Sequence, residues 1–237
     1  MEVTPASGQQ TGRRVALVAL LALLGVAFTA LSVWQLARRT EKLALIAAVE
    51  QRAHATPVDA PGPGQWPAIN ARHDAYRAVK VTGLFLKGGD TLVQAVSDFG
   101  PGYWVITPLR TGPGWIVLVN RGFTAADRRT NYGAAPSDAV TVTGLLRVTE
   151  PHGGFLHAND PAQDRWYSRD VATIGKARRL SQVAPYFIDA GTNPDPAQPI
   201  GGLTVIDFPN NHLNYALTWL ALAILSAIGA VRALRRS

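Results

Sequence analysis

Two uncharged apolar stretches, one near each end of the chain, restrict what this sequence can fold into. Residues 15–33 and 213–231 are each 19 residues long and contain no Asp, Glu, Lys or Arg. A helix of about 20 apolar residues crosses the hydrocarbon core of a bilayer. The first stretch exceeds the roughly 7–15 residues of a signal-peptide core, and no clear small-residue cleavage site follows it. We therefore expect two membrane-spanning helices, the first of them a retained anchor.

Basic residues set the expected orientation of these spans. Residues 193–212 contain no Lys or Arg, whereas three arginines follow the second span: Arg232, Arg235 and Arg236. Positively charged flanks stay on the cytoplasmic side. We therefore predict a cytoplasmic tail at 1–12, a transmembrane helix at 13–37, an extracytoplasmic domain at 38–212, a second transmembrane helix at 213–232 and a cytoplasmic tail at 233–237.

The flanks of the first span fit this orientation less well. Arg13 and Arg14 precede the span, but Arg38, Arg39 and Lys42 follow it on the predicted outer side. Cations in that place either anchor the helix to lipid headgroups or bind an anionic ligand at the membrane surface. The residues alone leave both explanations open.

The charge distribution and the missing residue types exclude several functions. The net charge is +7, but the basic residues gather at the span ends instead of forming a stripe, so we expect the lipid bilayer as a partner and no nucleic acid. The absence of cysteine excludes disulfides, thiol redox chemistry and thiolate metal sites. The only methionine is residue 1, which also excludes a thioether copper site.

The segment between the spans has the pattern of a β-rich domain. A helical pattern at 40–52 continues the first span, and a proline- and glycine-rich linker follows at 54–66. Strand-like runs are then predicted at 76–86, 91–96, 103–110, 115–122, 140–148, 184–189 and 203–208. Tight turn signals at 87–90 and 111–114 favour antiparallel neighbours. One short helix is predicted at 171–179, with Asp170 as its N-cap.

Two of these runs resemble each other. Residues 79–86 (VKVTGLFL) and 140–147 (VTVTGLLR) are identical at five of eight positions. A glycine interrupts each run, which is typical of a bulge or a sharp bend. We therefore predict two strands in comparable positions of a coiled sheet or small barrel. The expected fold class is a membrane α+β protein, with two transmembrane helices flanking an extracytoplasmic antiparallel β domain that contains a short helix.

Polar and aromatic residues gather at the outer ends of both predicted spans. On a helix, His212, Tyr215 and Trp219 follow one another at i, i+3 and i+7, which places them on one face. The first span ends at the same depth with four further candidates: Trp34, Gln35, Arg38 and Arg39. If the two ends meet, they offer an axial nitrogen, aromatic faces and cations for carboxylates, the groups that bind haem. The alternative is that aromatic rings and a helix cap merely anchor the spans at the interface.

Motifs along almost the whole chain carry a family resemblance. The most specific are VNRG at 119–122 and NNHLNYALTW at 210–219. Weaker ones are WQ at 34–35, YR at 76–77, VTG at 81–83, GY at 102–103, TPL at 107–109, NDP at 159–161, WY at 166–167 and RD at 169–170. In these residues the chain resembles the Surfeit locus protein 1 family, assembly factors for haem–copper cytochrome oxidases.

The resemblance implies a role in supplying or inserting haem a during maturation of oxidase subunit I. It implies haem a as the cofactor, His212 as the candidate iron ligand, and Tyr215 and Trp219 as stacking or hydrogen-bonding partners. Arg38, Arg39 or Lys42 would pair with the propionates. It further implies a bacterial cytoplasmic or mitochondrial inner membrane, and we expect the bacterial one because no transit peptide is evident.

Two other readings remain open. The first is a membrane scaffold that recruits haem a synthase and nascent oxidase subunit I without binding haem. The second is an enzyme that uses the loop at 152–164, which carries His152 and His157. We favour a protein that is not an enzyme, because that loop has the turn residues Asn159, Asp160 and Pro161 and no regular metal-ligand spacing.

Overall fold

The computed structural model describes residues 7–151, 153–154, 157–193, 195–206 and 208–235. The chain divides into two compact units. The first, here called the helical unit, comprises Met1–Ala48 and Asp207–Ser237, and the second, the β domain, comprises Val49–Ile206. Each unit is described by itself.

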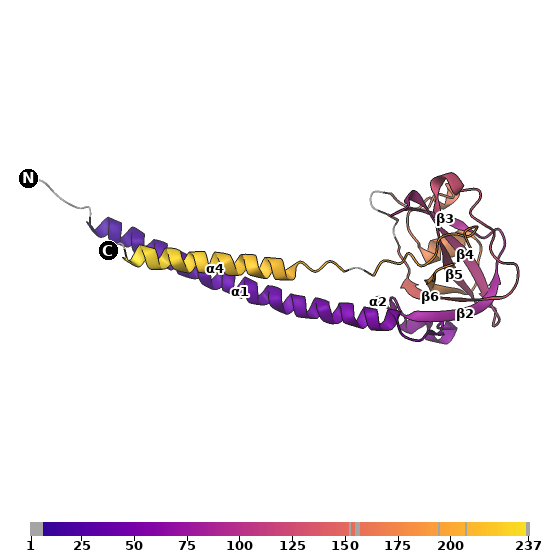
Figure 1. Ribbon diagram of the computed structural model, residues 1–237, viewed down its shortest axis with the longest axis horizontal. Helices are drawn as coiled ribbons and strands as arrows, with labels where there is room; N and C mark the ends of the chain where they lie inside the picture. The colour runs from indigo at the N-terminus through magenta and orange to yellow at the C-terminus, as the bar shows by residue number, and fades with distance from the viewer. Residues whose placement is uncertain (1–6, 152, 155–156, 194, 207, 236–237) are drawn as a thin grey trace, which may run out of the picture. The chain divides into compact units, whose positions relative to one another are not determined.

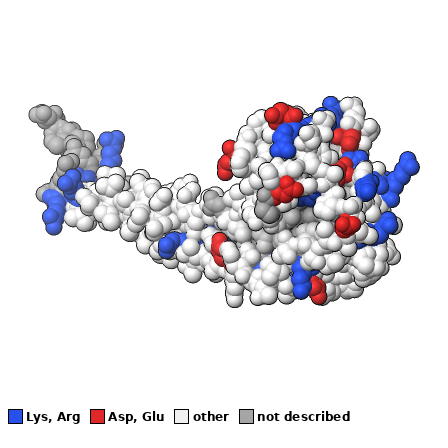
Figure 2. All heavy atoms as spheres, turned by 45° about the vertical axis from the view of Figure 1, so that its right-hand side comes forward, with Lys and Arg blue, Asp and Glu red and all other residues white. Residues whose placement is uncertain are grey.

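The helical unit is an antiparallel pair formed by α1 (Ser7–Ala53) and α4 (His212–Arg235), which lie side by side in Figure 1. Both helices are long and apolar enough to cross a membrane. Figure 2 shows a largely uncharged surface along this unit, with basic residues gathered at one end. The helical pattern at 40–52 continues α1 without a break, as predicted.

Small residues bring the two helices together. The Ser32 hydroxyl donates to the carbonyl of Ala216 at 2.9 Å, and both residues are buried. A Cβ on Gly25 would lie 3.8 Å from Cβ of Ser226, and one on Gly229 would lie 3.3 Å from a methyl of Leu21. Close backbone approach at small residues is the usual way in which helices associate without a hydrophobic driving force in lipid.

The β domain is a closed five-stranded barrel. Its strands are β2 (Ala78–Phe85), β4 (Gly100–Thr111), β5 (Ile116–Ala125), β6 (Val140–Val148) and β7 (Val183–Ala190). They follow the order β2-β6-β7-β5-β4, and pairing of β2 with β4 closes the barrel. Two further strands extend the sheet: β3 (Thr91–Ser97) on β4 and β1 (Val58–Asp59) on β2. The predicted fold class is confirmed.

Several details differ from the sequence-based expectation. Most pairs are antiparallel, but β5–β7 and β1–β2 are parallel. The chain between β6 and β7 is long and contains α3 (Val171–Ala177), so no tight turn dictates the direction of β7. The predicted strand at 203–208 is wrong: residues 203–206 and 208 have no regular structure, and residue 207 lies outside the described residues.

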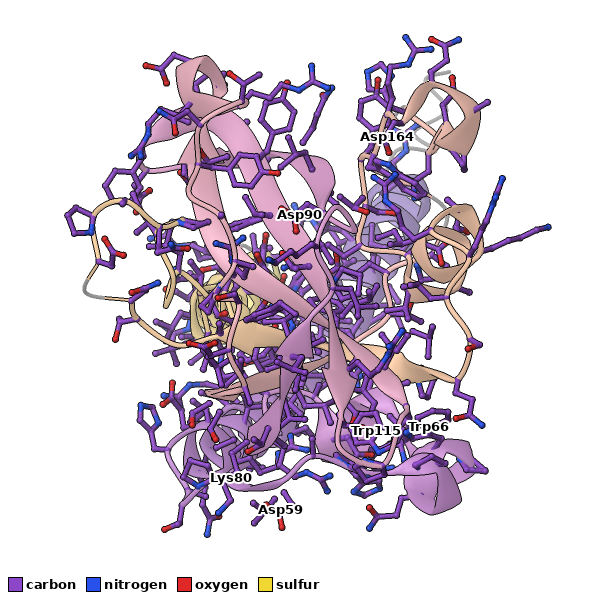
Figure 3. The ribbon with its side chains drawn as sticks, turned by 90° about the vertical axis from the view of Figure 1, so that its right-hand side faces the viewer. Asp59, Trp66, Lys80, Asp90, Trp115 and Asp164 are labelled. Atoms are coloured by element: carbon purple, nitrogen blue, oxygen red, sulfur yellow. The ribbon has the colours of Figure 1, made fainter. Side chains whose placement is uncertain are left out.

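The region before β2 is also more ordered than predicted. The expected linker at 54–66 contains β1 and the start of the 3₁₀ helix η1 (Pro63–Ala68). A one-turn helix, α2 (Ala71–Asp74), follows, so α3 is not the only helix of this domain. The rings of Trp66 in η1 and Trp115 before β5 meet edge to face with their centres 6.0 Å apart. Figure 3 labels both residues, which lie next to each other. Two further 3₁₀ turns are η2 (Ala126–Arg128) and η3 (Pro161–Gln163).

The barrel has an apolar interior and an apolar outer layer, and β5 contributes to both. Val117 and Val119 point into the barrel interior, whereas Leu118 points outward, as the period of a strand requires. Leu118 is nevertheless buried, because α3 and Trp166 cover this side of the sheet. Asp170 caps α3 as predicted, its side chain accepting from the backbone N–H of Thr173 at 3.1 Å.

The repeated segments at 79–86 and 140–147 occupy comparable positions, which confirms the prediction. They are neighbouring antiparallel strands whose register centres on the pair Val81 and Val142. About this centre Gly83 faces Val140 and Gly144 faces Val79. Each glycine also pairs on its other side, Gly83 with Thr111 of β4 and Gly144 with Ala190 of β7. The glycines therefore mark the two corners where a strand passes from one neighbour to the next.

Candidate functional site

The first residue of α4, His212, meets the middle of α1 through the side chain of Gln35. Nδ1 of His212 lies 2.7 Å from Oε1 of Gln35. An amide oxygen only accepts hydrogen bonds, so Nδ1 carries the proton and donates it. In the neutral imidazole the lone pair is then on Nε2. A histidine that donates one ring N–H to an oxygen while its other nitrogen keeps a lone pair has the arrangement typical of metal-ligating histidines.

The cations expected at this place lie on α1 close to aromatic rings. The guanidinium carbon of Arg38 is 6.0 Å from the ring centre of Trp34, and Arg38 also forms an ion pair of 2.8 Å with Glu41. Nζ of Lys42 lies 5.2 Å from the ring centre of Phe208. Arg39 is half-buried. Both partners of the Arg38–Glu41 pair are more than half exposed, so this ion pair is weak and exchangeable.

The aromatic residues divide into two groups. Trp219 stacks on Phe28 of α1 with ring centres 5.5 Å apart, so its ring is part of the helix–helix contact. Trp34 and Tyr215 are 53% and 56% exposed. The face of α4 toward α1 carries Ala216 and Trp219, and Tyr215 lies beside this face. The structure thus brings His212 and Trp219 to the helix contact, and leaves the rings of Trp34 and Tyr215 accessible.

A buried charge cluster in the β domain was not found by sequence reasoning. At its centre is Asp189 of β7, only 4% exposed. One carboxylate oxygen accepts from Asn120 at 2.8 Å and from Arg169 at 3.2 Å. The other accepts from Arg147 at 2.8 Å and from Thr204 at 3.0 Å. The available signal was one charged residue, Asp189, inside the otherwise apolar strand VAPYFIDA at 183–190.

Glu150 completes this cluster. Arg169 donates two hydrogen bonds to its carboxylate, at 2.9 and 2.7 Å, and its guanidinium lies 4.8 Å from the ring centre of Phe187. Burial alone would lower the pKa of Arg169, but the charges of Asp189 and Glu150 outweigh it and raise that pKa. Every charge has a partner, so this cluster stabilises the barrel.

The arginine of the VNRG motif belongs to a second cluster, on the opposite face of β5 from Asn120. Nη2 of Arg121 donates to the carbonyl of Gly133 at 2.9 Å and to Oε1 of Gln198. Nη1 lies 3.9 Å from the carboxylate of Asp90, the residue labelled near the centre of Figure 3. That carboxylate accepts hydrogen bonds from Thr107 at 2.6 Å and Tyr132 at 3.0 Å. Burial lowers the pKa of Arg121, against the opposing effect of Asp90.

This second cluster predicts an unusual tyrosine titration. Burial, with the negative charge of Asp90, raises the pKa of Tyr132 from 10.0 to about 12. Because the pKa is raised on folding, the contribution of the protonated phenol to stability is complete below pH 10.0 and is lost as the pH rises to about 12. Phenolate absorbance should therefore contain a component with a midpoint near pH 12 that is missing from Tyr132→Phe. An unchanged titration curve in that variant would contradict this assignment.

In the loop at 152–164, the described residues 153–154 and 157–164 make contacts with the chain that follows. His152 lies outside the described residues. The ring of His157 stacks on that of Tyr167, with ring centres 4.9 Å apart. The side-chain oxygen of Asn159 accepts hydrogen bonds from the backbone N–H groups of Tyr167 and Ser168. The hydrogen bond from Arg165 lowers the pKa of Asp160. The described part of the chain contains no group of three or more His, Asp or Glu side chains that could hold a metal ion.

Comparisons with known proteins agree with the motifs. A profile of the SURF1 family matches residues 22–224. Human Surfeit locus protein 1 is 32% identical over 225 residues, which cover 86% of this chain and 73% of that protein. The SURF1-like protein of Monosiga brevicollis is 33% identical over 225 residues, which cover 88% of this chain and 83% of that protein. The chain belongs to the SURF1 family, the cytochrome oxidase assembly factors that its motifs resemble.

Proposed function

We propose that this chain is a non-enzymatic membrane assembly factor that binds haem a beside the contact between Gln35 and His212. It would present the haem to subunit I of haem–copper cytochrome c oxidase. The observation that carries the proposal is the hydrogen bond between Gln35 and His212, which orients an imidazole with a lone pair on Nε2. Family membership supports the link to oxidase assembly. Subunit I and haem a synthase are the proposed protein partners.

The residues around the Gln35–His212 contact fit such a ligand. His212 would hold the iron through Nε2, and Gln35 would keep the ring oriented and increase its basicity. Arg38, Arg39 and Lys42 would pair with the propionates, Arg38 by exchanging its exposed partner Glu41. Trp34 and Tyr215 have accessible rings for stacking, and Trp219 would act through the Phe28 contact. When bound, haem a supplies an iron and a flat apolar ring for these groups to hold.

The positive-inside pattern supports an orientation with both termini in the cytoplasm and the β domain on the opposite side. In that orientation the Gln35–His212 contact lies toward the outer surface of the membrane. The bacterial cytoplasmic membrane stays a prediction, since the relatives named above are eukaryotic.

The test is the absorbance spectrum of detergent-purified chain from cells that make haem a. We expect His212→Ala to lose most of the bound haem and Gln35→Ala to weaken haem binding roughly tenfold, as loss of an orienting hydrogen bond does for metal-ligating histidines. His54→Ala is the matched control, since His54 is exposed, follows the last residue of α1 and is bonded to Glu50. Unchanged haem content in His212→Ala would remove the ligand assignment.

A second candidate is a scaffold that recruits haem a synthase and subunit I without binding haem. The observation that favours it is that Trp219 and Arg38 already have partners within the helical unit. It predicts a colourless protein, co-purification of both partners and unaltered oxidase assembly in His212→Ala. Haem that co-purifies in stoichiometric amount and depends on His212 would rule it out.

A further inference from the structure

β3 is the outermost strand at one end of the sheet, and one of its sides is only partly covered. It pairs with β4 on one side and forms a single bridge on the other, between Val93 and Trp166. There the N–H of Gln94 donates to the carbonyl of Trp166 at 2.8 Å, so the backbone groups of Gln94 point away from β4. Because this direction repeats at every second residue of an antiparallel strand, the N–H and C=O of Val96 point away as well. Pro101, which has no N–H to donate, stands opposite Val96 in β4 and agrees with this assignment.

The uncovered part of this side, residues 94–96, is here called the free edge. Among the described residues, none forms a hydrogen bond with the C=O of Gln94 or with the N–H and C=O of Val96. The bridge to Trp166 covers the strand before the free edge, and the two-residue turn of Asp98 and Phe99 leads into β4 after it. The free edge therefore offers one donor and two acceptors to an added extended chain.

β3 lacks the residue types that protect an edge from other strands. Its sequence, TLVQAVS at 91–97, contains no charged residue and no proline. Natural edge strands are blunted by lysines, prolines or bulges, or are covered by a loop. The bridge to Trp166 ends before the free edge, and Val96 is 82% exposed. An uncharged edge with an exposed apolar side chain is a template for pairing with another strand.

A hollow of about 540 Å³ lies beside the free edge. One wall is the end of β3 with its turn, including Val96 and Phe99, and the other is the segment at 202–205, in which Val205 is 74% exposed. Phe99 is itself 56% exposed, although it belongs to a tight turn. The polar side chains that line the hollow are those of Ser97, Asp98 and Thr204. An aliphatic side chain from an added strand would therefore find apolar contacts on both walls.

The backbone groups of the free edge favour a polypeptide over a lipid as the occupant. Hydrocarbon offers no partner for an N–H or a C=O, so insertion into a bilayer would leave these groups of Val96 unpaired. An extended peptide pairs with them, and its side chains alternate between the two faces of the sheet. A second copy of β3 fits less well, because the bridge to Trp166 shortens the free edge in both copies. Asp98 is the one charged residue that lines the hollow in the described part of the chain, so a basic side chain would be accepted beside it.

We propose that the free edge and the hollow bind an extended, largely apolar segment of a partner polypeptide, which adds to β3 as a further strand. The N–H of Val96 donates to this segment, the C=O groups of Gln94 and Val96 accept from it, and one of its aliphatic side chains occupies the hollow. All of these residues belong to the β domain. The proposal is therefore independent of haem binding, and its test does not involve haem.

The experiment uses the fluorescein-labelled peptide Lys-Val-Thr-Val-Thr-Val-Lys as a probe on the full chain in lipid nanodiscs, with empty nanodiscs as the blank. Fluorescence anisotropy titration gives the dissociation constant. The control probe is the same peptide N-methylated at its fourth and fifth residues, which blocks both edges of the peptide strand and keeps every side chain. We expect the control probe to bind roughly tenfold more weakly, because it loses a backbone hydrogen bond. Equal affinity of the two probes would overturn the proposal, and this comparison needs no variant of the chain.

Variants of the chain locate the binding. Val96→Pro removes the donor of the free edge, at a position where proline is tolerated because the N–H faces away from the sheet. We expect it to weaken binding of the unmethylated probe roughly tenfold, whereas Val96→Ala keeps the N–H and should weaken binding only about twofold. Val58→Ala is the matched control, since Val58 is 50% exposed and lies in β1, the strand at the opposite end of the sheet, and it should change nothing.

Two results with these variants would overturn the proposal. One is a loss of binding in Val58→Ala as large as that in Val96→Pro, which would place the peptide elsewhere. The other is a dimer of the wild-type chain in detergent that Val96→Pro converts to a monomer, which would assign the free edge to a second copy.

Discussion

Replacing Asp189 by alanine is expected to destabilise the β domain by about 3–5 kcal/mol, the cost of breaking a buried ion pair from one side. The carboxylate accepts hydrogen bonds from two arginines, and both of these are largely buried. Without it, Arg147 loses its strongest partner and Arg169 retains only Glu150. The free energy of unfolding in urea, followed by the fluorescence of the buried Trp166, measures the loss.

Two further variants separate charge from packing in this prediction. Asp189→Asn removes the charge and keeps one acceptor oxygen, which can serve Asn120 or Thr204 but not both, since these two donate to different carboxylate oxygens. We therefore expect an intermediate loss of stability. Asp59→Ala removes a carboxylate whose side chain is 92% exposed. One of its oxygens lies 3.9 Å from Nζ of Lys80. Both residues are labelled in Figure 3. Asp59→Ala should change the free energy of unfolding by no more than about 0.5 kcal/mol. Equal losses in Asp189→Ala and Asp59→Ala would show that the buried cluster does not stabilise the barrel.

Gly144→Ala and Gly83→Ala should each destabilise the barrel by about 3 kcal/mol, the upper end of what overpacking usually costs. A Cβ on Gly144 would overlap the carbonyl oxygen of Asp189, and one on Gly83 would overlap the carbonyl oxygen of Arg110. These obstacles are backbone atoms of neighbouring strands, so they cannot move aside as a flexible side chain can. Thermal unfolding followed by far-ultraviolet circular dichroism reports the effect.

The matched control for these glycines is Gly112→Ala. Gly112 lies in the turn between β4 and β5, and an added Cβ there would meet no atom within 4 Å. Its expected effect is close to zero or slightly stabilising, because alanine restricts the unfolded chain. A barrel that tolerates alanine at Gly83 and Gly144 as well as at Gly112 would refute the corner role of the two glycines.

The elements with a local signal could be predicted from the sequence. Apolar length defined both helices of the helical unit, alternation defined most barrel strands, and the repeated VTG segment located the two corners. The parallel placement of β7 could not be predicted, because the long connection before it leaves its direction to tertiary packing. The segment at 203–208 had a strand-like composition, yet its described residues form no strand, and Thr204 bonds to Asp189 of the barrel through its side chain.

The candidate site was predictable to a similar degree. Gln35 and His212 could be paired in advance because both stand at the same depth of their spans, a one-dimensional property of the sequence. The stacking of Trp219 on Phe28 depends on how the helices rotate against each other, which composition does not reveal. The Asp189 cluster joins residues of β5, β6 and β7 with loop residues far away in the sequence, so no member by itself indicated the others.

The contact between Gln35 and His212 also has a consequence for how the protein responds to proteases. It ties together two points that are far apart along the backbone, and the helix pair below it reinforces the tie through Ser32 and Ala216. A single cleavage in the intervening polypeptide would therefore produce two fragments in a denaturing gel. In a native gel the nicked molecule would still migrate as one species.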